Sequence, residues 1–166
     1  AISHLRDALR IEPDRYAPQA NLAEVFTSIG ELDQALVHYK EAASHRDCSA
    51  DLLNNMAIAK YKQLLRDGLA GERRELDGIL HIYEKAILLD DGHAKSHLNS
   101  ARLLIALKRF KKAEKHIRSC LRANPGHGQC EAELPNIRKA TRRKTKKGSQ
   151  RGRSGAHSRR KGKKRS

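Results

Sequence analysis

The sequence predicts an all-α fold, a solenoid of antiparallel helix hairpins followed by a disordered basic C-terminal tail. Three observations lead to this prediction: a pattern that repeats every 34 residues, helical spacing of small and apolar residues in each unit, and a lysine- and arginine-rich end. Ala, Leu, Lys, Arg and Glu dominate the composition, whereas aromatic residues make up 4% and Trp is absent. Such a composition favours helices and disfavours a large β-sandwich or β-barrel core.

Two sets of residues carry the repeat. The first set recurs at shifts of 34, 44 and 34 residues, and the second recurs at shifts of 34 and 44. The first set contains Ala1, Ala35, Ile79 and Ala113, and seven positions later Ala8, Ala42, Ala86 and Cys120. The second set contains Asn21, Asn55 and Asn99, and two positions later Ala23, Ala57 and Ala101. The longer shift predicts an insertion of ten residues between Lys60 and Ile79, centred on residues 66–72.

Each set has the spacing of one helix face, so the repeating unit is predicted to be a helix, a short turn and a second helix. Gly30 is expected to break the first complete pair, and Pro13 and Pro125 are expected to end second helices. Small residues at fixed positions have a physical reason, because they let two antiparallel helices approach closely.

The unit resembles the tetratricopeptide repeat (TPR). The family pattern has small residues at positions eight, twenty and twenty-seven, an aromatic residue at twenty-four and Pro at thirty-two. These positions hold Ala23, Ala35, Tyr39 and Ala42 in 16–49, and Ala101, Ala113, Ile117, Cys120 and Pro125 in 94–127. The sequence departs from the pattern at position four (Gln19, Leu53 and His97), at Lys60, and at Asp47, which replaces the proline. The resemblance covers roughly residues 1–127 and implies a right-handed superhelix with a concave groove.

The repeat divides the chain into six segments. The first is expected to be the second helix of a truncated repeat, which favours an upstream continuation of the array. Three repeats follow, the middle one containing the insertion, and then a cap in which Ala132, Leu134 and Ile137 cover the last apolar face. Pro135 argues against one long helix in the cap. The segments are residues 1–15, 16–49, 50–93, 94–127, 128–137 and the disordered tail 138–166.

No pattern typical of a phosphate-binding loop, a dinucleotide site, a serine hydrolase or a zinc protease occurs in the chain. No apolar run of about 18 residues is present, which excludes a spanning helix. The chain is therefore expected to be non-catalytic, with no cofactor and no small-molecule substrate.

The cysteines and histidines raise the question of a metal site. Zinc-ligand types cluster within fifteen residues at His116, Cys120, His127 and Cys130. Cys120, however, holds a packing position of the repeat, and the spacing matches no usual zinc pattern, so no metal is expected. Three cysteines at unrelated spacings also make a disulfide framework improbable and favour a reducing compartment. The predicted location is intracellular, in the nucleus or cytoplasm.

The resemblance implies that first helices line a partner-binding groove. Three Asn residues share one position of these helices, where their amides either bond an extended peptide or bond neighbouring backbone. The candidate groove residues are Asn21, Glu24, Ser28, Asn54, Asn55, Lys62, Lys95, Asn99 and Arg102. Their charges change from acidic and neutral to basic, which favours a partner segment with an acidic end near Lys95 and Arg102.

Some family members grip the C-terminal carboxylate of a chaperone with Lys and Asn at set positions. This chain has Ala20 and Glu24, then Asn54 and Ile58, where one such Lys–Asn pair is needed. That carboxylate clamp is therefore predicted to be absent.

The tail carries most of the net charge of +16. From Arg138 to the end there are 15 Lys and Arg and no acidic residue, so the tail cannot bury a core. Two basic clusters are present: Arg142, Arg143, Lys144, Lys146 and Lys147, and then Arg159, Arg160, Lys161, Lys163, Lys164 and Arg165. The pair resembles a bipartite nuclear-localisation signal for an import receptor. Nonspecific binding to nucleic acid or to an acidic membrane surface is the alternative.

The function predicted is a non-catalytic scaffold that binds a peptide or helix of a partner protein in the groove. Two alternatives are kept. One is a nucleic-acid- or ribosome-associated protein that uses the tail and a basic surface of the last repeat, formed by Lys108, Arg109, Lys111, Lys112, Lys115 and Arg118. The other is an accessory, substrate-presenting domain of a larger enzyme such as a glycosyltransferase.

Overall fold

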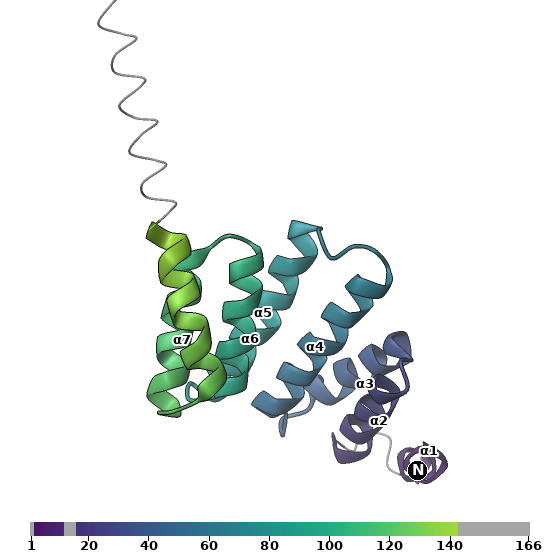
Figure 1. Cartoon of the computed structure of the whole chain (residues 1–166). Coiled ribbons are helices and arrows are strands. Elements are labelled where there is room, and N and C mark those ends of the chain that lie inside the picture. The colour runs from purple at the N-terminus through teal and green to yellow at the C-terminus, as the bar shows by residue number, and fades with distance from the viewer. Residues whose placement is uncertain (1, 12–15, 143–166) are drawn as a thin grey trace, which may run out of the picture.

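The computed structural model describes residues 2–11 and 16–142, and these form a curved row of α-helices (Figure 1). The predicted tail beyond Arg142 and Pro13 lie outside the described residues. The described part contains no strand and no helix long and apolar enough to cross a membrane. The helices are α1 (Ile2–Ile11), α2 (Tyr16–Ser28), α3 (Leu32–Ser44), α4 (Ala50–Arg66), α5 (Arg73–Leu89), α6 (Ala94–Ala106), α7 (Phe110–Ala123) and a final helix over residues 128–142.

Helices pack mainly in antiparallel pairs, α2 with α3, α4 with α5 and α6 with α7. Small side chains lie where the paired helices meet. Ala23 and Ala35 of the first pair, and Ala101 and Ala113 of the last, have no exposed surface. A larger side chain at these positions would force the helix axes apart, which explains why the repeat keeps alanine there.

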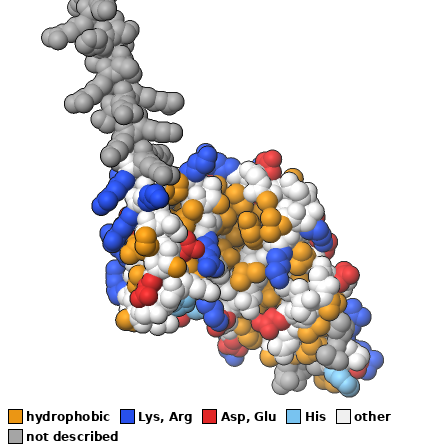
Figure 2. Space-filling view, in the orientation of Figure 1, with side chains coloured by type: hydrophobic (Ala, Val, Ile, Leu, Met, Phe, Trp, Pro, Cys, Tyr) orange, Lys and Arg blue, Asp and Glu red, His pale blue; other side chains and the backbone are white. Residues whose placement is uncertain are grey.

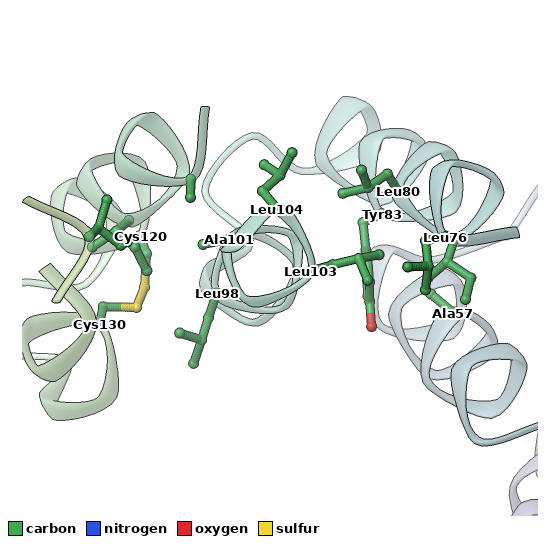
Figure 3. Close-up of a cluster of buried hydrophobic side chains, with 14 of the residues drawn as sticks. Ala57, Leu76, Leu80, Tyr83, Leu98, Ala101, Leu103, Leu104, Cys120 and Cys130 are labelled. Atoms are coloured by element: carbon green, nitrogen blue, oxygen red, sulfur yellow. A yellow bond between two sulfur atoms is a disulfide. The ribbon is translucent and has the colours of Figure 1, made fainter. Parts of the chain in front are cut away.

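The apolar core runs along the array rather than forming one centre. One cluster spans α4 to α7 and the final helix (Figure 3), and a second joins α2, α3 and α4. Tyr39, Tyr83 and Ile117 hold the same repeat position and are at most 5% exposed. Each such side chain contributes roughly 1.5–3 kcal/mol by leaving water, so every unit depends on its neighbours for burial.

The insertion lengthens both helices of the middle repeat. α4 and α5 have 17 residues each, whereas α2 and α3 have 13. The longer hairpin is tied to both neighbours by ion pairs. Arg66 of α4 lies 3.0 Å from Asp33 of α3, and Arg109 donates two hydrogen bonds, of 2.6 and 3.0 Å, to the Asp77 carboxylate of α5.

Repeat position four, which departs from the family pattern, is matched by a compensating residue at position twenty-three. The pairs are Gln19–His38, Leu53–Ile82 and His97–His116. A hydrogen bond of 2.7 Å joins the first pair and one of 3.1 Å joins the third. The second pair is apolar and belongs to one buried cluster. Paired replacement keeps first and second helices in contact without the usual aromatic ring.

The cap differs from its prediction. The final helix continues through Pro135 to residue 142, five residues into the segment predicted as tail. Proline removes one N–H donor and its ring crowds the carbonyl one turn earlier, but the helix is held on both sides of it: Cys130 and Ile137 are at most 1% exposed. Burial on both sides offsets the missing hydrogen bond.

A disulfide framework was expected to be improbable, yet two of the three cysteines are bonded. Cys120 near the end of α7 and Cys130 near the start of the final helix form a disulfide. The turn between the two helices reverses the chain and brings together residues ten positions apart, which spacing alone did not reveal. Cys48 remains a free thiol. The expectation of a reducing compartment, and with it the predicted nuclear or cytoplasmic location, loses this support.

Lys108 offers a test of the turn geometry. It holds the repeat position of Gly30, and both residues have positive φ, +56° and +85°. Because a Cβ atom is strained in this region, Lys108→Gly should raise the free energy of unfolding by about 0.5–1 kcal/mol in urea denaturation followed by circular dichroism. Gly30→Ala is the matched control with the opposite sign. Equal stability of Lys108→Gly and the unchanged chain would contradict a strained turn.

Candidate functional site

A pocket of about 360 Å³ opens between α4 and α6. Ile79 and Tyr83 of α5 lie at its base, and Leu103 and Ala106 of α6 form one wall. Figure 2 shows hydrophobic side chains gathered in the middle of this face, with charged side chains around them. A largely apolar, concave surface with a few polar groups is the form that binding sites commonly take.

The pocket follows from the repeat. Positions six, nine and thirteen of each first helix lie on one helix face, because their spacing is i, i+3 and i+7. These positions hold Asn21, Glu24 and Ser28 in α2, Asn55, Ile58 and Lys62 in α4, and Asn99, Arg102 and Ala106 in α6. Of the predicted groove residues, Lys62, Asn99 and Arg102 line the pocket. Sequence reasoning missed Ile58 and Ala106, which share positions with chosen residues, and Tyr61, Leu103 and the α5 residues at the base.

Amides join the first helices in a directed row of hydrogen bonds. Asn99 Nδ2 donates to Asn54 Oδ1 at 2.9 Å, and Asn54 Nδ2 donates to Asn55 Oδ1 at 3.3 Å. Asn55 Nδ2 then donates to Glu24 Oε1 at 3.0 Å. The row crosses from α6 through α4 to α2. The Asn99 and Asn55 amides therefore bond other side chains and not the neighbouring backbone. Asn21 lies outside the row and is exposed.

The structure corrects the expected role of Asn54. This side chain is 2% exposed, so it lies inside the wall between α4 and α6 and not on the groove surface. Both ends of its amide are bonded. A buried amide that links two helices fixes their spacing and would be costly to leave unpaired.

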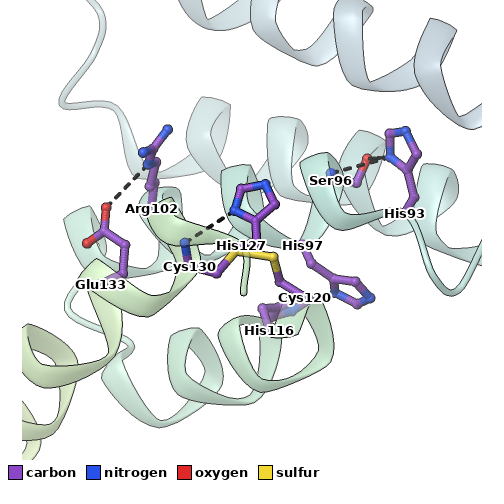
Figure 4. The surroundings of a disulfide bond; sticks show 9 residues. All are labelled: His93, Ser96, His97, Arg102, His116, Cys120, His127, Cys130 and Glu133. Atoms are coloured by element: carbon purple, nitrogen blue, oxygen red, sulfur yellow. Dashed lines mark hydrogen bonds and ion pairs between the residues drawn. A yellow bond between two sulfur atoms is a disulfide. The ribbon is translucent and has the colours of Figure 1, made fainter. Parts of the chain in front are cut away.

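The predicted basic end of the groove is largely neutralised. Lys95 Nζ donates to Asp51 Oδ1 at 2.9 Å, and Arg102 Nε donates to Glu133 Oε1 at 3.3 Å (Figure 4). The hydrogen bond from Lys95 is the main cause that lowers the pKa of Asp51. Lys62, also at the pocket, has no carboxylate partner among the described residues. An acidic partner group would therefore meet Lys62 more readily than Lys95.

A second charged surface lies on α7 and the turn before it. Of the six basic residues expected there, Arg109 pairs with Asp77, and Arg118 donates to Glu114 at 2.8 Å. The other four are exposed and have no carboxylate partner in the described part of the chain: Lys108, Lys111, Lys112 and Lys115. Of the two tail clusters, only Arg142 is described, at the end of the final helix.

His97 of α6 and His116 of α7 form the polar core of the last hairpin (Figure 4). His97 Nε2 donates to the Asp91 carbonyl at 2.9 Å, and a hydrogen bond of 3.1 Å joins its Nδ1 to His116 Nδ1. Burial above all, with His97, Lys115 and Lys112 nearby, lowers the pKa of His116 to about 4. His116 is therefore neutral at pH 7, and its ring serves packing rather than charge.

Comparisons with known proteins find a match to one family model and several solved structures with a similar fold. Residues 94–127 match the family model described as tetratricopeptide repeat. Curated protein sequences give no significant match.

Three similar solved structures show the extent of the likeness. The first TPR domain of human RPAP3 is 17% identical with a TM-score of 0.66, covering 81% of this chain and 98% of that one. The first TPR of Spaghetti (RPAP3) bound to the HSP90 peptide SRMEEVD is 18% identical with a TM-score of 0.64, covering 76% and 92%. A tetratricopeptide repeat protein from Parabacteroides merdae is 25% identical with a TM-score of 0.68, covering 83% and 52%.

The amide row predicts unequal effects of two Asn substitutions. Asn54→Ala should lower the free energy of unfolding by about 1–3 kcal/mol, because it removes the partner of Asn99 Nδ2 and of Asn55 Oδ1. Asn21→Ala, on the exposed face of α2, is the control and should change it by less than about 0.5 kcal/mol. Urea denaturation measures both, and equal effects would show that the row does not stabilise the array.

His116 predicts a loss of stability in acid. Its folded-state pKa lies below the unfolded value of about 6.5, so the unfolded chain binds more protons between about pH 6.5 and 4, and stability falls as the pH falls through this range. Between pH 7 and 5 the loss should be roughly 1 kcal/mol, below the full linkage value because water reaches part of the ring. His116→Gln should reduce the difference between urea denaturation at the two pH values. An unchanged difference would exclude His116 as its source.

Proposed function

Because the chain is a tetratricopeptide-repeat protein, we propose that it is a non-catalytic scaffold that binds a segment of a partner protein along α2, α4 and α6. The observation that carries this proposal is the pocket between α4 and α6. Its apolar base would take an aliphatic or aromatic side chain of the partner, which leaves water on binding.

Polar groups around the pocket suggest how such a segment is oriented. Asn99 reaches both the pocket and the amide row, and Lys62 brings a positive charge without a described counterion. We therefore propose a partner segment with an apolar residue for the pocket and a carboxylate near Lys62. Most of the binding free energy would come from the apolar anchor, since an exposed ion pair contributes at most about 1 kcal/mol.

The Spaghetti (RPAP3) structure, bound to an HSP90 peptide, supports a peptide-binding role by analogy of fold. The groove residues of this chain favour a different peptide. Glu24 would repel a terminal carboxylate, and Ile58 offers it no donor. We therefore propose an internal segment as the ligand and not a chaperone C-terminus.

The basic tail is proposed to act in nuclear targeting. Its two clusters, separated by a short spacer, have the charge pattern of a bipartite import signal. Binding to an import receptor would be independent of the groove.

A second candidate is supported by four exposed lysines on α7 and in the turn before it, which lie in the last repeat, nearest in sequence to the tail. Together they would bind phosphates without sequence specificity, and salt would weaken this binding steeply. Such a function predicts recovery of nucleic acid by the full chain.

Filling the pocket tests the scaffold proposal. Ala106 is exposed and lines the pocket, so Ala106→Trp should occupy the space without removing a core side chain. Affinity purification of the full chain from nuclease-treated lysate should recover the partner at least about tenfold less well, because losing a buried anchor costs more than 1.4 kcal/mol. Gln34→Trp, on an exposed position of α3, should leave recovery unchanged.

Three outcomes decide between the candidates. Equal recovery by both variants after nuclease treatment would exclude the pocket as the binding site. Loss of all partners on nuclease treatment would favour the nucleic-acid candidate instead. Recovery of an import receptor that depends on the tail clusters would support nuclear targeting, and failure to recover one would count against it.

A further inference from the structure

A histidine side chain, which is a common metal ligand, lies beside the Cys120–Cys130 disulfide. Cys120 Sγ, Cys130 Sγ and a ring nitrogen of His127 all lie within 4.8 Å of one another. The two cysteines have no exposed surface, whereas His127 is half-buried at the turn between α7 and the final helix (Figure 4). Two sulfurs and an imidazole at this separation match the soft ligand set that zinc prefers.

We propose that reduction of the Cys120–Cys130 disulfide opens a zinc-type metal site formed by both thiolates and His127. A dithiol reductant supplies two electrons and two protons: the S–S bond breaks, two thiols form, and the reductant becomes a disulfide. Binding of a divalent cation then releases the two thiol protons to water. The resulting complex carries no net charge, and one water completes a tetrahedral coordination.

The geometry requires only small movements. Thiolates on a tetrahedral zinc ion lie about 3.8 Å apart, since each Zn–S bond is about 2.3 Å. The Cα atoms of the two cysteines are already 6.6 Å apart, so rotation of the side chains can supply this separation. The contact from Cys130 N–H to His127 Nδ1 is long, at 3.4 Å, and leaves the ring able to turn toward the sulfurs.

Local charge favours the same site. Cys130 lies in the first turn of the final helix, which begins at residue 128. The positive end of that helix stabilises the negative charge that thiolates bring. Other candidate ligands are committed or distant in the fold: His116 is bonded to His97, and Cys48 packs in a different cluster between α3 and α4.

The site would keep the cap attached in either redox state. The final helix covers the apolar surface of α6 and α7 through Cys130, Leu134 and Ile137. The disulfide links this helix to α7 covalently, and after reduction the metal would replace the lost link. The cap would then be retained in both oxidising and reducing surroundings.

Cobalt chloride is the probe for this site, because Co²⁺ bound to thiolate gives a charge-transfer band. The full chain carrying Cys48→Ser, which removes the only thiol outside the cluster, is reduced, freed of reductant and titrated without oxygen. We expect one Co²⁺ per chain with a thiolate band that Zn²⁺ abolishes, and no such band for the oxidised chain.

His127→Gln leaves both buried sulfurs in place, so it tests the ligand set without disturbing the core. It should weaken Co²⁺ binding at least about tenfold, with unchanged circular dichroism. His116→Gln is the matched control and should not alter the affinity. Absence of a thiolate band in the reduced chain, or equal affinity of the His127→Gln and unchanged proteins, would overturn the proposal. Binding without that band would indicate adventitious histidine ligands and would also overturn it.

Discussion

Close approach of paired helices at small residues is the constraint on which the rest of this structure depends. Alanines such as Ala23, Ala35, Ala101 and Ala113 are fully buried where first and second helices meet. Their size sets the distance between the axes, and this distance decides which larger side chains fit above and below the contact. Tyr39, Tyr83 and Ile117 fill those spaces, so each hairpin is closed by its neighbours and the array is stable only as a whole.

The same spacing turns three positions of every first helix toward one surface. Since the hairpins repeat, these positions form rows along the surface. The residue type in a row differs from repeat to repeat, and these differences set the charge and polarity of the surface. The row that holds Glu24 in α2 holds Ile58 in α4 and Arg102 in α6. Apolar residues line the pocket between α4 and α6. Function in such an array is therefore encoded in the residues that vary between equivalent positions rather than in those that repeat.

Polar contacts inside the array act mainly as spacers. Asn54 bonds across to Asn99, and His97 bonds to His116, at places where a hydrophobic contact would be the ordinary solution. Directional bonds fix the register of two helices more narrowly than apolar contact does. At the C-terminal end a covalent bond has this task, since Cys120–Cys130 holds the cap on α7. The last hairpin and the cap, which contain the proposed metal ligands, are thus linked covalently as well as by packing.

Sequence alone determined the repeat and its helical hairpins, because a period of 34 residues and the i, i+3, i+7 spacing are properties of the chain itself. The tertiary structure decided which residues of different helices come into contact. Asn54 is buried because α6 packs beside α4, Lys95 and Arg102 are paired because Asp51 and Glu133 come from other helices, and Cys120 meets Cys130 because the chain reverses. Burial and pairing depend on distances across the fold, and no local pattern of residues contains those distances.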